Sequence, residues 1–125
     1  LVSLLAPALC AGNAIVALGA ETGHLAASIL AEACATGDVP AGVVNILTGL
    51  REELVPEIAA HRDLDAALIA NPSRADEATM RDGTSDNMKR VIIQRAADWF
   101  DAELESPWRI EPLVELKTIW HPSGT

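Results

Sequence analysis

Short apolar runs alternate with amphipathic, alanine-rich segments along most of this chain. Four of these runs have the length and the side chains of strands covered on both faces of a sheet, and they span residues 13–18, 42–49, 64–70 and 89–94. The third run is the weakest strand signal because its alanines favour helix. Strands that alternate with helices at this spacing predict β-α-β units, a parallel sheet and right-handed crossovers.

The segments between the runs carry signals for helices. We expect helices over residues 3–11, 22–36, 51–60 and 74–81, and a further helical piece through Trp99 and Leu104. Thr22 is the expected cap of the second helix, and Ser73 is the expected cap of the fourth. The second helix also has an apolar face, formed by Leu25, Ile29, Leu30 and Ala33.

The last twenty residues follow a different pattern. Residues 113–120 alternate in part, and the more apolar parity consists of Val114, Leu116, Thr118 and Trp120. Prolines flank this stretch, which is typical of an edge strand that adds to another sheet, such as one in a partner chain. Four aromatic side chains cluster in the last quarter, where they either pack the tail onto the body or form an interface: Trp99, Phe100, Trp108 and Trp120.

The expected fold is therefore α/β, with a three-layer, mostly parallel, Rossmann-like sheet and a C-terminal edge or oligomerisation strand. We divide the chain into residues 1–105, which form the α/β body, and residues 106–125, which form the strand and tail. A chain of 125 residues is long enough for one compact domain with one core.

Charge and cysteine usage narrow the classes of function. The net charge of −9 argues against nucleic acid and anionic membranes as partners, because both select for basic patches. Cys10 and Cys34 lie in apolar surroundings without a CxxC spacing, so we expect two small buried thiols, no metal site and a reducing cytoplasm. The uncharged run before Glu21 is interrupted by proline and glycine, which argues against a membrane span.

The turn after the first strand has the shape of a nucleotide-binding turn. Gly19 and Gly23 allow a close backbone approach, and the following helix directs its dipole at the turn. Residues 1–50 contain no Lys or Arg, however, and Glu21 repels phosphate although it can accept a ribose hydroxyl. Gly19 and Glu21 are therefore the cofactor-binding candidates, and we interpret them as remnants of a site that now serves as scaffold.

Three segments resemble the coenzyme-binding region of the aldehyde dehydrogenase superfamily: "APALCAGNAIVALGAET", "AGVVNILTG" and "HRDLDAALIA", in this order and spacing. The segment "PLVELKTIW" resembles that family's C-terminal oligomerisation strand. The resemblance covers residues 1–72 and 106–121 well and residues 85–97 faintly. It implies a coenzyme-domain remnant within residues 1–105 and, in the whole family, an NAD or NADP coenzyme, a nucleophilic cysteine and a general-base glutamate.

Several positions depart from the family pattern. Leu18 stands where the family has a lysine, so only Glu21 remains of the pair that holds the adenosine ribose. Asn71 replaces the glycine of the phosphate loop, and Pro72 beside it has no N–H to offer a phosphate. Gln94 stands at the position of the general base, and a neutral amide cannot take a proton from water. Neither cysteine matches the context of the family nucleophile, and the block that carries it is missing.

We therefore expect a pseudoenzyme, a non-catalytic module with a structural or oligomerisation role. It forms a homo-oligomer or docks on an active aldehyde dehydrogenase unit, and it uses no cofactor and no metal. The alternative is a part of a working NAD(P)-dependent enzyme that oxidises an aldehyde to an acid, with its other residues supplied by another segment or chain. The start at Leu1, inside an apolar segment, favours a piece of a longer protein. A small-ligand binding module that uses the vestigial groove is a third possibility.

Overall fold

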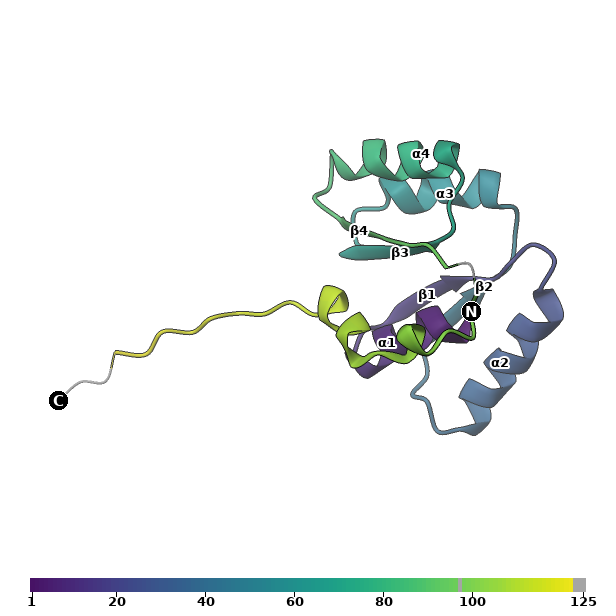
Figure 1. Ribbon diagram of the computed structural model, residues 1–125, viewed down its shortest axis with the longest axis horizontal. Coiled ribbons are helices and arrows are strands. Elements are labelled where there is room, and N and C mark those ends of the chain that lie inside the picture. Colours follow the sequence, from purple (N-terminus) through teal and green to yellow (C-terminus); the bar gives the residue numbers. More distant parts are fainter. Residues whose placement is uncertain (97, 123–125) are drawn as a thin grey trace.

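A computed structural model describes residues 1–96 and 98–122, in which helices and parallel strands alternate along the chain (Figure 1). The main elements are α1 (Val2–Cys10), β1 (Ile15–Leu18), α2 (His24–Thr36), β2 (Val44–Leu47), α3 (Arg51–Ala60), β3 (Ala66–Ala70), α4 (Arg74–Thr84) and β4 (Arg90–Gln94). Three 3₁₀ turns follow at Ala102–Glu105, Pro107–Arg109 and Glu111–Leu113. The predicted α/β class and the parallel strand direction are confirmed.

The strands pair differently from the single predicted sheet. β1 pairs with β2 and β3 pairs with β4, which gives two separate two-stranded sheets (Figure 1). Val16 and Leu47 project from the same face of the β1–β2 pair and are 51 % and 45 % exposed, so this face is uncovered. The apolar runs predict where strands form, but strand order depends on contacts between distant segments. The three-layer arrangement therefore stays a prediction.

The best-buried core lies between α3, α4 and the sheet of β3 and β4. Val55, Ala59 and Met80 form its centre, and Ile69 and Val91 pack against them from the strands. The two helices approach closely at a glycine. A Cβ added to Gly83 would lie 2.6 Å from the Cβ of Ala59, which is too close for any side chain. Pro56 lies inside α3, which begins at Arg51 rather than later.

Lys89 is a buried charged residue beside this core. Its Nζ donates to the carbonyl oxygens of Ile58 and Ala59, the latter at 3.1 Å, and so satisfies acceptors at the end of α3. The burial lowers the pKa of the Lys89 ammonium below its usual range. The lysine at the start of the fourth apolar run therefore serves helix capping and packing.

One of the two predicted helix caps is confirmed. Ser73 Oγ accepts from the Asp76 N–H at 3.1 Å, and Asp76 Oδ2 accepts from the Ser73 N–H at 3.2 Å, which completes a capping box on α4. The Thr22 prediction is wrong, because α2 begins at His24 with Gly23 as its N-cap and has no side-chain cap.

The expected apolar face of α2 is also wrong. Ala27 is its buried residue, at 2 % exposure, and Leu30 is half-buried beside it. Leu25 and Ile29 project from the opposite side of the helix and are 76 % and 59 % exposed. Because α2 is apolar nearly all round, its sequence does not specify which side contacts the sheet.

The segment that contains the 3₁₀ turns is held against the body by contacts with distant residues. Asn13 Nδ2 donates to the Leu113 carbonyl at 3.0 Å, and Arg90 Nη1 donates to the Val114 carbonyl at 2.8 Å. The Leu113 side chain is buried. These contacts fix the chain as far as Val114.

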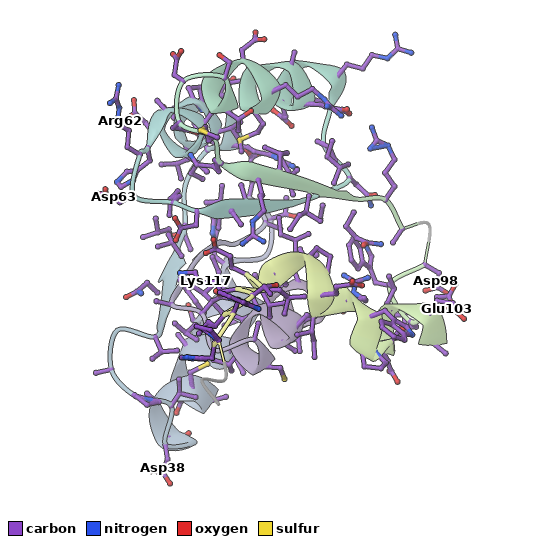
Figure 2. All side chains as sticks on the ribbon, turned by 90° about the vertical axis from the view of Figure 1, so that its left-hand side faces the viewer. Asp38, Arg62, Asp63, Asp98, Glu103 and Lys117 are labelled. Atoms are coloured by element: carbon purple, nitrogen blue, oxygen red, sulfur yellow. The ribbon has the colours of Figure 1, made fainter. Side chains whose placement is uncertain are left out.

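Residues 115–122, which we name the arm, leave the body as an extended segment (Figure 1). Figure 2, which views the molecule from the side that the arm faces, shows Lys117 in front of the body. The predicted strand over 113–120 is not formed among the described residues, because an isolated extended segment has no neighbour to complete its hydrogen bonds. Leu116 and Trp120 on the arm are 86 % and 81 % exposed. Phe100 and Trp108, outside the arm, are also largely exposed.

We predict that Met88→Gly stabilises the fold by about 1 kcal/mol, because Met88 has a left-handed backbone, with φ of 56°, that disfavours a residue with a Cβ. Its side chain is 92 % exposed, so little packing is lost. Urea unfolding measures the change. Met88→Ala is the matched control and gives no comparable gain, and equal stability of the two variants would contradict the explanation.

Candidate functional site

The carboxyl ends of the strands carry the residues that the sequence marks as a cofactor site. Gly19 follows β1, and its N–H donates to the Leu47 carbonyl at 3.0 Å. A Cβ at Gly19 would lie 3.3 Å from the Cβ of Ala27, so the glycine lets α2 pack closely on the strand. The role of Gly19 in this structure is therefore helix packing.

Glu21 uses its carboxylate within the chain. Its Oε1 accepts from the backbone N–H of Arg51 at 2.7 Å, which places the negative charge at the start of α3. This contact ties the loop after β1 to the helix after β2. One of the two carboxylate oxygens of Glu21 is therefore engaged with the backbone.

Arg51 is a residue of this edge that the sequence analysis did not identify. Its Nη2 donates to the Ala70 carbonyl at 3.3 Å, and its Nε lies 3.4 Å from Asp76 Oδ2. A single side chain thus connects the start of α3, the end of β3 and the first turn of α4. The available signal was its position directly after the second strand, but its partners are distant in sequence.

Asn71 connects the loop after β3 to the loop after β4. Its φ of 42° is left-handed, a conformation that asparagine tolerates better than most residues. Its Nδ2 donates to the Ala96 carbonyl at 3.0 Å, and its Oδ1 accepts from the Ala96 N–H at 3.0 Å. Asn71 therefore holds the loop after β4 through both its side-chain nitrogen and its side-chain oxygen.

A second ion-pair cluster lies beside these contacts. Glu77, in the first turn of α4, accepts from Arg81 at 2.9 Å and from Arg95 at 2.6 Å. The first of these pairs joins residues four positions apart, one turn along α4. The hydrogen bond from Arg81 and the nearby charge of Arg95 hold the pKa of the Glu77 carboxyl below its ordinary value of 4.5.

As arranged, the strand ends do not fit the phosphates of a dinucleotide. Arg51 and Arg95 are both paired with carboxylates of α4, and Pro72 lacks an N–H. Gln94, at the position of the family's general base, lies on β4 and carries a neutral amide. The residues brought together here connect the loops that follow the strands to the helices beside them.

The two cysteines form no disulfide in the structure. The predicted burial of both thiols is wrong, because Cys10 is exposed and Cys34 is half-buried. Within residues 1–96 and 98–122, no three His, Cys, Asp or Glu side chains come together as a metal site. The same residues contain no helix with the length and apolarity needed to cross a membrane.

We predict that Glu77→Gln destabilises the protein at neutral pH and makes no difference in strong acid. Because the Glu77 pKa is lowered on folding, its contribution is present above the ordinary pKa of 4.5 and is lost as the pH falls through the folded value. Urea unfolding of both proteins across this range tests the sign. Glu32→Gln is the control, since Glu32 forms no ion pair among the described residues, and a pH-independent difference would contradict the assignment.

Comparisons with known proteins agree with the sequence resemblance. The chain is 33% identical over 90 residues to the NADP/NAD-dependent aldehyde dehydrogenase PuuC of Escherichia coli, an overlap of 72% of this chain and 18% of that protein. It is 30% identical over 105 residues to aldehyde dehydrogenase, cytosolic 1, of Elephantulus edwardii, an overlap of 80% and 21% respectively. It is also 33% identical over 90 residues to the mitochondrial aldehyde dehydrogenase of Leishmania tarentolae, with 72% and 18% covered.

The chain thus spans about a fifth of the length of these relatives. No solved structure matches it significantly. The pattern of the family described as "Aldehyde dehydrogenase family" matches residues 1–97, which include all four strands and the edge described above. By this match, the chain belongs to the aldehyde dehydrogenase family.

Proposed function

We propose that this chain is a non-catalytic aldehyde dehydrogenase module with a structural role, in which residues 1–105 are the scaffold and residues 106–125 carry an oligomerisation strand. One observation carries the proposal: the polar groups at the strand ends bind one another. Glu21 is bonded to the Arg51 backbone, Arg51 to α4, and Asn71 to Ala96. A coenzyme would have to break these contacts before it could use the groups.

The chemistry of the remaining positions supports the same proposal. Gln94 cannot serve as a general base, and Leu18 has no charge for a ribose or a phosphate. Among the described residues, neither Cys10 nor Cys34 belongs to a group of three or more side chains that could bind a metal ion. In this proposal the module binds no cofactor and supplies no catalytic residue of its own.

The partner in this proposal is a second copy of the chain or an active aldehyde dehydrogenase unit. The arm exposes Leu116 and Trp120, which share one parity, and a strand with one apolar face is stabilised by joining another sheet. The uncovered face at Val16 and Leu47 is the part that a third layer would cover in the assembly. A cytoplasmic location belongs to the proposal and is supported by the cytosolic enzyme among the relatives.

A second candidate function is a part of a working NAD(P)-dependent aldehyde dehydrogenase. The similarity to an enzyme named for NADP and NAD favours it, as does the turn that retains Gly19 and Glu21. In this case the two residues are the surviving contacts to NAD or NADP, and other segments supply the chemistry that oxidises an aldehyde to an acid.

Coenzyme titration separates the two candidates. We predict that the chain shows no heat of binding and no thermal shift with NAD or NADP at millimolar concentration, because its strand-end groups are already bonded to one another. Leu18→Lys restores the family's charge at the turn and is the matched test of a damaged site. Saturable binding by the parent chain, strengthened in Leu18→Lys, would establish the second candidate instead.

We further predict that the arm drives association. The double substitution Leu116→Ser and Trp120→Ser removes its apolar parity without changing the net charge, so the assembly dissociates to monomers in size-exclusion chromatography with light scattering. Glu115→Gln with Lys117→Gln also preserves net charge, changes the other parity and leaves the assembly intact. A parent chain that is strictly monomeric and ignores active family members would refute the structural proposal.

A further inference from the structure

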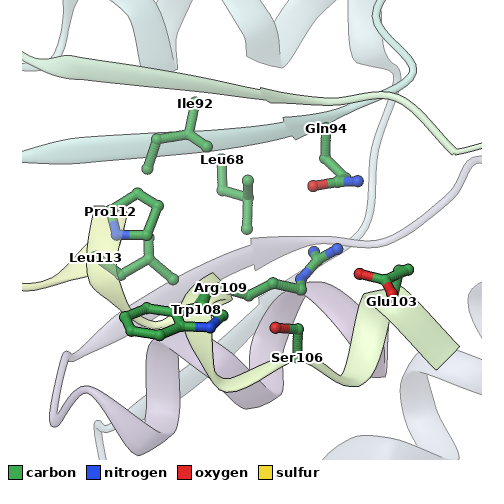
Figure 3. Close-up of a pocket in the computed structure, with 9 residues that line it drawn as sticks. All are labelled: Leu68, Ile92, Gln94, Glu103, Ser106, Trp108, Arg109, Pro112 and Leu113. Atoms are coloured by element: carbon green, nitrogen blue, oxygen red, sulfur yellow. The ribbon is translucent and has the colours of Figure 1, made fainter.

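A pocket lies on the side of β3 and β4 that faces away from α3 and α4 (Figure 3). Leu68 and Ile92 are register partners in the two strands and form its apolar wall. The opposite wall comes from the 3₁₀ turns, which contribute Ser106, Trp108 and Arg109. These three residues lie beyond residues 1–97, the range that the family pattern matches.

Arg109 is poorly satisfied by the protein around it. A guanidinium has five N–H donors. Among the described residues, the Arg109 guanidinium makes one long hydrogen bond, from Nη2 to the Ser3 carbonyl at 3.4 Å. Its Nε is buried without a hydrogen-bond partner. No carboxylate of the described residues lies within ion-pair distance, whereas Arg51, Arg81 and Arg95 each have one.

This combination identifies the charge of the missing partner. A partly buried cation is costly unless an anion or several acceptors compensate it. Figure 3 shows the Arg109 guanidinium directed toward the side of the pocket where Gln94 and Glu103 lie. Because Nε is covered, an anion would meet the terminal Nη groups, which suit the paired oxygens of a carboxylate.

The other lining residues limit the shape of this anion. The Gln94 amide and the Ser106 hydroxyl supply neutral donors at the pocket wall. Leu68 and Ile92 suit a short aliphatic chain. Glu103 would repel a second negative charge, which favours one carboxylate over two.

We propose that this pocket binds a short-chain aliphatic monocarboxylate, with the carboxylate on Arg109 and the chain against Leu68 and Ile92. The inference does not rest on the proposed structural function. The site lies on the face of β4 away from its core and requires residues 106–109, whereas the strand-end edge is built from the loops that follow the strands.

Calorimetric titration of the full chain with butyrate and with its neutral analogue butyramide tests the proposal. We expect saturable binding of butyrate and at least about tenfold weaker binding of butyramide, because the charge-assisted bonds need an anionic group. Glutarate binds more weakly than butyrate, because Glu103 repels its second carboxylate. Tryptophan fluorescence provides a second readout, since Trp108 lines the pocket. Absence of saturable butyrate binding, or equal affinity for butyramide, would overturn the proposal.

Variants locate the binding. Arg109→Gln weakens butyrate binding at least about tenfold, whereas Arg62→Gln, which removes an exposed charge far from Glu103 in Figure 2, leaves it unchanged. If Arg109→Gln unfolds, Gln94→Glu serves instead, because a new carboxylate in the pocket repels the ligand. Parent-like affinity in a folded variant at either position rejects the site. A chain that is monomeric and still binds butyrate would contradict the proposed assembly and leave the pocket proposal standing.

Discussion

The position of Arg51 at the junction of three loops is the constraint on which the strand-end edge depends. Its backbone N–H holds Glu21, and its guanidinium contacts the end of β3 and the first turn of α4. Through this one residue, the sheet of β1 and β2 is connected to the sheet of β3 and β4 without a shared ladder of hydrogen bonds. Glu21, a candidate coenzyme-binding residue, is also one of the groups that hold the loops together, so a coenzyme at this turn would compete with the Arg51 backbone for its carboxylate.

This competition gives a physical account of how a family fold can persist without the family chemistry. The core around Val55, Ala59 and Met80 is apolar and needs no ligand to form. Once a charged group at the edge finds a partner within the chain, the loops stay ordered without a bound dinucleotide. The proposed structural role uses this independence of the fold from the coenzyme.

Local signals in the sequence predicted local structure well. The Ser73 cap depends on a residue three positions away, and it forms as expected. Strand pairing and the buried side of α2 depend on which distant surfaces meet, and an alanine-rich helix offers similar surfaces all round. The same reason explains why Arg51 and Arg109 were missed: their environments are built by segments that lie far away along the chain.

The anchoring of Leu113 and Val114 has a consequence for any complex that the arm forms. Since Asn13 and Arg90 hold the root of the arm, much of the rotational freedom of the arm is already restricted before it meets a partner. The body therefore sets the direction in which the arm leaves it. In the proposed assembly, the fixed root of the arm would limit the orientations that the two subunits can take.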